Sequence, residues 1–224
     1  MNILVTLDRN YLPPLRVMLG SLLRNDPGET FEIYAIGDGL LPEDWTALEE
    51  LCAGRGHIHP LEVPADLFAD APVARYWTRA MYYRLLAGIT DPVNRLRLEN
   101  YEAEAYYNSG VLVMDLSAMR REVRPGDIFD YAREHADILL LPDQDVLNGL
   151  YGGQILGVDD SLWNYDARRF DRYLLLSQGE RDMDWVMDHT AILHFCGKRK
   201  PWNHSYQGRF SALYKHYQRL VERR

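Results

Sequence analysis

The sequence has few cysteines and no broad excess of basic residues, and both scarcities exclude whole classes of protein. Its two cysteines, Cys52 and Cys196, lie far apart and form no Cys-x-x-Cys pair, so a disulfide scaffold is not expected. A formal net charge of −8 argues against non-specific nucleic-acid binding, which needs a broad basic field. We therefore expect free thiols, a reducing compartment and no nucleic-acid partner.

Long apolar runs are also missing. No run reaches the ~18 residues of a membrane helix, and the first ten residues, MNILVTLDRN, have neither the cationic region nor the long apolar stretch of a signal peptide. The sequence contains no internal repeat, no low-complexity tract and no GxxxxGK[ST] phosphate-binding loop. These absences predict a soluble, cytoplasmic protein.

The residues that are present form alternating apolar patterns. Short β-branched or apolar runs predict strands at 3–7, 31–36, 57–63, 111–116, 154–158 and 191–195. Helical spacing, with a Pro start in several cases, predicts helices at 15–22, 42–52, 78–87, 125–136, 142–150 and 206–221. Alternating strands and helices indicate the α/β class, with a largely parallel central sheet flanked by helices. Ligands bind at the carboxyl ends of such strands.

One stretch interrupts the alternation. Residues 88–105, GITDPVNRLRLENYEAEA, contain no apolar strand. A parallel sheet would normally continue with a strand after the helix predicted at 78–87. The sheet therefore lacks an expected strand at this point of the sequence.

Two motifs in the first half combine polar and aromatic residues. TLDRNYLPP (6–14) follows the first strand, where Asp8 and Asn10 suit a base edge or ribose and Tyr11 suits stacking on a base. A helix cap is the alternative, because Asp and Asn favour such turns. In RAMYYRLLA (79–87), Arg84 stands within an apolar helix, either as a snorkelling side chain or as a contact to an anionic ligand.

Two further motifs place polar side chains at element ends. YYNSGVLVMDL (106–116) puts Asn108 and Gly110 directly before a predicted strand, as an ordinary turn or as a site that needs close backbone approach. LLPDQDVLNGL (140–150) puts Asp143, Gln144 and Asp145 at a helix start. Carboxylates stabilise that end of a helix, but one cap needs one acid, and two acids with an amide favour a functional site.

The most specific motif is HFCGKRKPW (194–202). His194 ends an apolar run, Gly197 permits a tight turn, and Lys198 and Lys200 supply compact charges for phosphate oxygens. From Lys198 onward the chain has eight Lys or Arg and one acid. Such a basic end suits an anionic ligand or a weak membrane-surface contact, and a solvated helix face is the alternative.

These motifs, in this order, resemble glycosyltransferase family 8, whose members are retaining transferases that use nucleotide-diphospho-sugars, usually UDP-linked. The resemblance covers nearly the whole chain. It implies a GT-A fold in a single domain, 1–224, with a nucleotide-binding half (1–116) and an acceptor and diphosphate half (117–224). It also implies a UDP-hexose donor and a glycan or lipid-linked acceptor of the cell envelope, with the enzyme in the cytoplasm at the inner face of the membrane.

The resemblance also assigns roles to individual residues. Asp143 and Gln144 look like the pair that holds the donor sugar, with Gln144 near the anomeric carbon, and His194 looks like a ligand of Mn²⁺ or Mg²⁺. The remaining donor contacts are Asp8, Asn10 and Tyr11 for the uridine, Arg84 and Asn108 nearer the sugar, and Gly197, Lys198 and Lys200 for the diphosphate.

The sequence departs from the family at one point. The family carries a strand ending in an Asp-x-Asp metal motif between the helix that resembles YYRLLA and the turn that resembles NSG, and this chain has no Asp-x-Asp there. A single histidine is a poor anchor for Mn²⁺ or Mg²⁺, which prefer several oxygen ligands. The carboxylates in the affected stretch are Glu99, Glu102 and Glu104, and no geometry favours one of them.

Two explanations of this departure stay open. Either a piece of the natural chain is missing from this sequence, which predicts a break in the trace between residues 87 and 97, or the deletion is real. A real deletion predicts a non-catalytic UDP-sugar-binding module. A metal-dependent nucleotide hydrolase is a more distant alternative.

Overall fold

The computed structural model describes residues 1–63, 106–139 and 141–223. The chain forms two compact units, which are described separately: unit 1 consists of residues 1–87 and 213–224, and unit 2 of residues 88–212. The predicted helix at 78–87, the interrupted stretch 88–105 and the predicted break between 87 and 97 lie outside the described residues.

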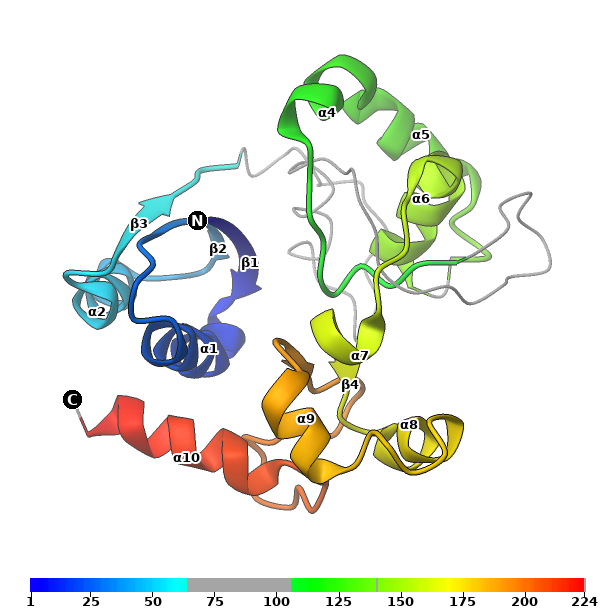
Figure 1. The fold of residues 1–224 in the computed structure, drawn as a ribbon. Coiled ribbons are helices and arrows are strands. Elements are labelled where there is room, and N and C mark those ends of the chain that lie inside the picture. The colour runs from blue at the N-terminus through cyan, green and yellow to red at the C-terminus, as the bar shows by residue number, and fades with distance from the viewer. Residues whose placement is uncertain (64–105, 140, 224) are drawn as a thin grey trace. The chain divides into compact units, whose positions relative to one another are not determined.

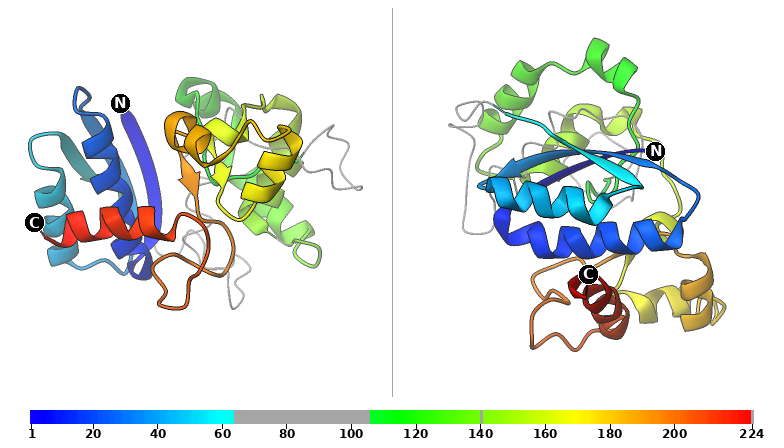
Figure 2. Two further views of the ribbon diagram at one scale, coloured as in Figure 1. Left: turned by 60° about the horizontal axis from the view of Figure 1, so that its bottom comes forward. Right: turned by 90° about the vertical axis from the view of Figure 1, so that its left-hand side faces the viewer.

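Unit 1 is built on a parallel three-stranded sheet in the order β1 (Asn2–Asp8), β2 (Phe31–Asp38) and β3 (Gly56–Pro60). Helices α1 (Leu12–Asn25) and α2 (Pro42–Cys52) lie on the same face of this sheet (Figure 2, right). The strand–helix–strand alternation predicted for this part of the sequence is confirmed.

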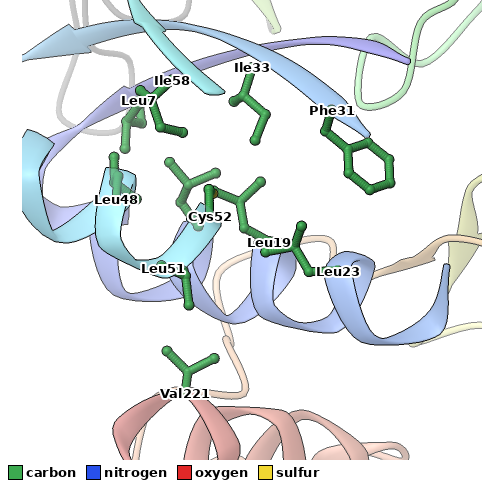
Figure 3. Packing of buried hydrophobic residues seen from close by; sticks show 11 residues of the cluster. Leu7, Leu19, Leu23, Phe31, Ile33, Leu48, Leu51, Cys52, Ile58 and Val221 are labelled. Carbon is green, nitrogen blue, oxygen red and sulfur yellow. The ribbon is translucent and has the colours of Figure 1, made fainter. Parts of the chain in front are cut away.

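The core of unit 1 follows directly from the apolar spacing. Alternate residues of β2, such as Phe31 and Ile33, point toward the helices, and Leu19 and Leu48 fill the space between (Figure 3). Because strand side chains alternate between faces and helical ones recur every three to four residues, these positions meet. On α2, Leu48 and Cys52 are fully buried.

Helix α10 (Ser211–Glu222) contributes its last residues to this core. A Cβ added to Gly20 of α1 would lie 2.3 Å from Cγ2 of Val221, so only glycine allows the two helices to approach this closely. Figure 3 shows Val221 directed toward α1. The final helix begins five residues later than predicted, at Ser211.

Unit 2 is mainly helical among its described residues (Figure 1). Its helices are α4 (Leu116–Glu122), α5 (Pro125–Glu134), α6 (Pro142–Tyr151), the 3₁₀ turn η2 (Gly152–Gln154), α7 (Asp160–Trp163), α8 (Phe170–Leu176) and α9 (Met183–His189). Two short parallel strands, β4 (Tyr165–Asp166) and β5 (Leu193–His194), pair with Asp166 opposite His194. The sequence predicted α5 and α6 but not α4, α7, α8 or α9. Among the described helices, none is long and apolar enough to cross a membrane.

Two strand predictions were wrong. Residues 111–115 are neither strand nor helix, and α4 begins at Leu116 because the Asp115 carboxylate caps it by accepting hydrogen bonds from the N–H groups of Ser117 and Ala118. Residues 154–158 are likewise not a strand, since η2 ends at Gln154 and irregular chain follows. An apolar run becomes a strand only beside another strand, and no described strand pairs with either run.

Candidate functional site

In unit 1, the loop after β1 is held by its own polar side chains. Asp8 accepts a hydrogen bond from the N–H of Asn10 at 2.8 Å and so caps a 3₁₀ turn, η1 (Arg9–Tyr11). Arg9 Nε lies 3.0 Å from a carboxylate oxygen of Asp44, which also accepts the Leu41 N–H at 2.9 Å. The capping alternative for Asp8 is therefore realised, and the loop is fixed at the carboxyl end of β1.

In unit 2, the motif at 106–116 meets the start of α6. Asn108 Nδ2 donates to Gln144 Oε1 at 2.9 Å, and the Ser109 N–H donates to the same oxygen at 3.3 Å. The Ser109 hydroxyl donates to Asp143 Oδ2 at 2.9 Å. Asp143 and Gln144 are 3% and 7% exposed, so these hydrogen bonds satisfy polar groups that burial would otherwise penalise.

The chain of hydrogen bonds continues to β5. Asn164 Nδ2 donates to Asn108 Oδ1 at 3.2 Å, and Asn164 Oδ1 lies 2.7 Å from His194 Nδ1. Because the Asn164 oxygen faces Nδ1, that nitrogen carries the proton, and the lone pair of a neutral His194 ring is on Nε2. The structure thus joins four of the predicted site residues, Asn108, Asp143, Gln144 and His194, in one network, which we call the polar network.

A glycine permits this arrangement. A Cβ added to Gly110 would lie 2.4 Å from His194 Cε1 and 2.6 Å from Asn108 Oδ1, far inside van der Waals contact. The predicted need for close backbone approach at Gly110 is confirmed, and the group that approaches is the imidazole of His194.

The two acids at the start of α6 have different surroundings. Asp145 caps the helix, because its Oδ2 accepts the Leu141 N–H at 2.8 Å, and it also accepts a hydrogen bond from the Tyr106 hydroxyl. Burial and then the Asp145 carboxylate raise the pKa of Tyr106 well above its usual range, which keeps the hydroxyl protonated as a donor. Asp143 instead joins the polar network, so the cap uses one acid and leaves the other for the site.

The segment after β5 makes the tight turn that its glycine suggested. Gly197 has a φ of +79°, in the left-handed region that favours glycine. Lys200 Nζ donates to the Phe195 carbonyl at 2.8 Å, and burial lowers the pKa of this lysine. Lys198 is exposed on the same turn. The two lysines therefore lie on one turn that leaves the carboxyl end of β5.

The metal ligands implied by the family are not assembled by the described residues. In the described ranges no group of three or more His, Cys, Asp and Glu side chains could hold a metal ion. His194 Nδ1 is engaged by Asn164, and Asp143 is hydrogen-bonded to Ser109. The donor set in this part of the chain does not by itself fit Mn²⁺ or Mg²⁺, which prefer several oxygen ligands.

Sequence reasoning missed two members of the polar network, Ser109 and Asn164. Asn164 was missed, although a single amide between Trp163 and Tyr165 is an unusual polar residue in an aromatic setting, and it is 4% exposed. Arg84, predicted as a donor contact, lies outside the described residues.

Comparisons with known proteins place this geometry in a family. The family model for glycosyl transferase family 8 matches residues 90–205, just over half of the chain. General stress protein A of Bacillus subtilis is 26% identical over an alignment that covers 97% of this chain and 92% of that protein. Lipopolysaccharide 1,2-glucosyltransferase of Escherichia coli is 21% identical, with 91% of this chain and 73% of that protein covered.

The fold has a close counterpart among solved structures. The galactosyltransferase LgtC, crystallised with donor and acceptor sugar analogues, matches with a TM-score of 0.79 at 21% identity, covering 98% of this chain and 96% of LgtC. This likeness confirms the predicted GT-A fold.

The alignment with general stress protein A is longer than this chain. The alignment with general stress protein A has 270 positions, which exceeds the 224 residues of this chain by 46. At least 46 positions of that relative therefore have no counterpart here.

The family match includes the motifs at 106–116, 140–150 and 194–202, and on that ground the chain belongs to glycosyl transferase family 8 and is a glycosyltransferase enzyme.

Proposed function

We propose that this protein transfers a hexose from a UDP-hexose to a cell-envelope glycan or a lipid-linked acceptor, with retention of the anomeric configuration. The observation that carries the proposal is the polar network, whose hydrogen bonds join residues far apart in the sequence. Asn108 and Gln144 are 36 positions apart, and Asn164 and His194 are 30 positions apart. A buried polar network whose members are all satisfied holds them in one geometry, as a donor-binding site requires. All members of the network lie within the segment that the family model matches.

The residues of the polar network would hold the donor sugar. Gln144 Oε1 accepts from Asn108 and Ser109, and the Gln144 side chain also hydrogen-bonds Tyr106, so its amide is locked in one orientation. Asp143 is fixed by Ser109 and suits sugar hydroxyls as an acceptor. In this proposal both side chains position the anomeric carbon, while Lys198 and Lys200 stabilise the charge of the departing diphosphate.

The loop after β1 would take the nucleotide. Asp8 and Asn10 are polar groups on a turn that Arg9 and Asp44 hold in place, and Tyr11 has a half-exposed ring for stacking. A preorganised loop reduces the ordering cost of binding. The acceptor hydroxyl would then attack the anomeric carbon from the face that UDP leaves, and its proton would pass to the departing diphosphate.

The family resemblance adds a divalent metal with His194 as one ligand. The described residues do not complete such a site, and the proposed reaction is derived without it. The same fact supports a second candidate function, a UDP-sugar-binding module without turnover, since a chain without the Asp-x-Asp segment has lost part of the charge stabilisation that the reaction requires.

Calorimetric titration of UDP separates these possibilities. UDP is titrated with Mn²⁺ present and then with EDTA. Strong binding that requires Mn²⁺ would show a complete metal site, whereas metal-independent binding would show that cationic side chains hold the nucleotide. The His194→Ala variant is compared with His204→Ala, an exposed histidine of the same unit, and an unchanged Mn²⁺ response in His194→Ala would refute its role as a ligand.

Turnover is tested with a panel of UDP-hexoses and glycan acceptors, using NMR to follow the configuration at the anomeric carbon. We expect Gln144→Ala to reduce transfer by about 100-fold or more, as loss of a group that acts in the transition state does. Gln218→Ala is the matched control, at a half-buried glutamine of α10 that donates a hydrogen bond to Glu222. An inverted product would contradict retention, and UDP binding without any transfer would favour the binding module.

A further inference from the structure

Two loops leave the same end of a pair of strands in unit 2. β4 and β5 run parallel with Asp166 opposite His194, and the Ala167 N–H donates to the His194 carbonyl at 3.1 Å. Since parallel strands end at the same edge, the loop after Asp166 and the turn at Gly197 emerge together. This edge is where α/β proteins bind ligands.

The first loop carries an arginine that a carboxylate holds in a fixed orientation. Asp166 Oδ1 accepts from the backbone N–H of Arg168 at 3.0 Å and from its Nε at 2.9 Å, while Asp166 Oδ2 accepts from Nη2 at 2.7 Å. Burial acts to raise the pKa of Asp166, but the hydrogen bonds and charges of Arg168 and Arg169 outweigh it and lower that pKa overall. The carboxylate therefore stays ionised and the guanidinium stays oriented.

We call this pairing of Asp166 with Nε and Nη2 of Arg168 the clamp. The third nitrogen, Nη1, lies beside the turn at Gly197. A Cβ added to Gly197 would lie 2.7 Å from Arg168 Nη1, so glycine is required for the guanidinium to approach the backbone here. The Arg168 side chain nevertheless remains 52% exposed, which leaves it accessible to a ligand.

The surroundings of Arg168 are strongly cationic. The two loops, 166–169 and 195–200, carry five cations and one carboxylate, namely Arg168, Arg169, Lys198, Arg199 and Lys200 against Asp166. The charges of Arg168 and Lys200 both lower the pKa of the Cys196 thiol, so both cations lie near it. A planar guanidinium beside a glycine turn has the geometry that binds phosphate oxygens in a bidentate manner.

We propose that Arg168, held by Asp166 against the Gly197 turn, binds the diphosphate of the sugar nucleotide together with Lys200. The inference rests on the proposed function for the identity of the ligand, but the site itself is defined by its anion chemistry. Arg168 adds positive charge to the diphosphate site of a chain whose sequence lacks the Asp-x-Asp segment, and the diphosphate retains substantial affinity without a metal.

The test is calorimetric titration of inorganic pyrophosphate and of UDP into the full chain in EDTA. Arg168→Ala should weaken both by about 10- to 100-fold, as loss of a charge-assisted hydrogen bond does. Arg169→Ala is the matched control, because this neighbour pairs with the same carboxylate at 3.4 Å and should change either affinity less than threefold. Arg168→Lys should recover only part of the loss, because an ammonium cannot contact Asp166 and the ligand with a rigid fork.

Equal affinities for Arg168→Ala and Arg169→Ala, with both variants folded by circular dichroism, would overturn the proposal. The Asp166→Asn variant provides a second reading: weaker binding despite an unchanged Arg168 supports the clamp, and unaltered binding contradicts it. The two proposals fail separately. Pyrophosphate affinity that depends on Arg168 in a protein without sugar transfer would uphold this site and refute the transferase function. Sugar transfer with a donor KM unaffected by Arg168→Ala would uphold the transferase function and refute this site.

Discussion

The two units of the molecule bury different chemistry. Within the described ranges, the core of unit 1 consists of apolar side chains such as Leu19, Phe31 and Leu48. Every buried polar or charged residue of those ranges belongs to unit 2: Ser109, Asp143, Gln144, Asp145, Asn148, Ser161, Asn164 and Asp166. Unit 1 is thus stabilised by area removed from water, and unit 2 depends on hydrogen bonds being satisfied inside it.

This difference locates the chemistry. Buried polar groups are unfavourable unless each finds a partner, so a unit that concentrates them has given up stability that an apolar core would supply. In unit 2 they surround the helix start and strand end that carry the family motifs. Asn148 shows how the arrangement is maintained, because its Nδ2 donates at 2.7 Å to the carbonyls of both Tyr107 and Gln144 and so joins α6 to the segment before Asn108.

The largest effect is expected in the apolar core. Leu19→Ala should lower the free energy of unfolding by about 2–5 kcal/mol, because it leaves a cavity at a fully buried position. Met18→Ala, on the same helix but 43% exposed, should cost less than about 1 kcal/mol. Urea denaturation followed by circular dichroism measures both. Similar losses for the two variants would show that α1 does not pack as described.

Each unit contains one cysteine, so the alkylation rates of the two thiols compare the units. Burial raises the pKa of Cys52 in unit 1 to about 11. In unit 2 burial raises the pKa of Cys196 to about 11, although nearby cations oppose it. At pH 8 both thiols should therefore react with iodoacetamide about 100-fold more slowly than in the unfolded chain.

The raised pKa values of the two thiols also set how the free energy of unfolding changes with pH. The contribution of both thiols to stability is complete below pH 9, and it is lost as the pH rises toward 11, because the unfolded chain releases its thiol protons first. Cys196 should become reactive before Cys52, which is fully buried. Arg168→Ala should slow the reaction of Cys196 further, because the Arg168 charge lowers this pKa. Mass spectrometry of peptides alkylated from pH 8 to 11 measures the labelling rates of both cysteines in the wild type and in Arg168→Ala. Faster labelling of Cys52 than of Cys196 would contradict the expected order.

Asn164 tests the polar network itself. Asn164→Leu removes the acceptor for His194 Nδ1 and one of the donors to Asn108 Oδ1, and should lower the free energy of unfolding by about 1–3 kcal/mol. Asn164→Asp keeps an acceptor for His194 Nδ1 but removes the donor to Asn108. The ¹⁵N chemical shifts of the His194 ring distinguish its tautomers: we expect a protonated Nδ1 in the wild type and in Asn164→Asp, and a mixture in Asn164→Leu. A wild-type ring protonated at Nε2 would contradict the network as assigned.

Much of unit 1 could be predicted from the sequence because its determinants are local. The helix predicted at 42–52 has the observed bounds, since Pro42 starts it and its apolar positions recur with helical spacing. The strands at 3–7 and 31–36 lie within β1 and β2. Each of these segments carries its own signal in a window of about a dozen residues.

The site in unit 2 could be predicted only in part. The residue types at 108, 143, 144 and 194 were identified from motifs, but Asn164, which links them, is 56 positions from Asn108, and no local pattern reports such a contact. The predicted strand at 111–116 failed for a related reason, because an apolar run does not reveal whether a neighbouring strand exists to pair with it.

The smallest effect concerns two tyrosines of unit 2 whose rings stack at 4.4 Å. Tyr173 donates to Asp160 Oδ2 at 2.7 Å, whereas the hydroxyl of Tyr165 is buried without a hydrogen-bond partner among the described residues. Tyr173→Phe should therefore lower the free energy of unfolding by about 1 kcal/mol, and Tyr165→Phe should leave it within about 0.5 kcal/mol or raise it.

Both substitutions keep the aromatic packing, so the difference between them isolates the hydroxyl groups, and urea denaturation of the two variants measures it. If Tyr165→Phe were the more destabilising of the two, its hydroxyl would have a partner in the protein or in bound water. Unit 2 would then satisfy even this buried hydroxyl, and its contrast with the apolar core of unit 1 would be complete.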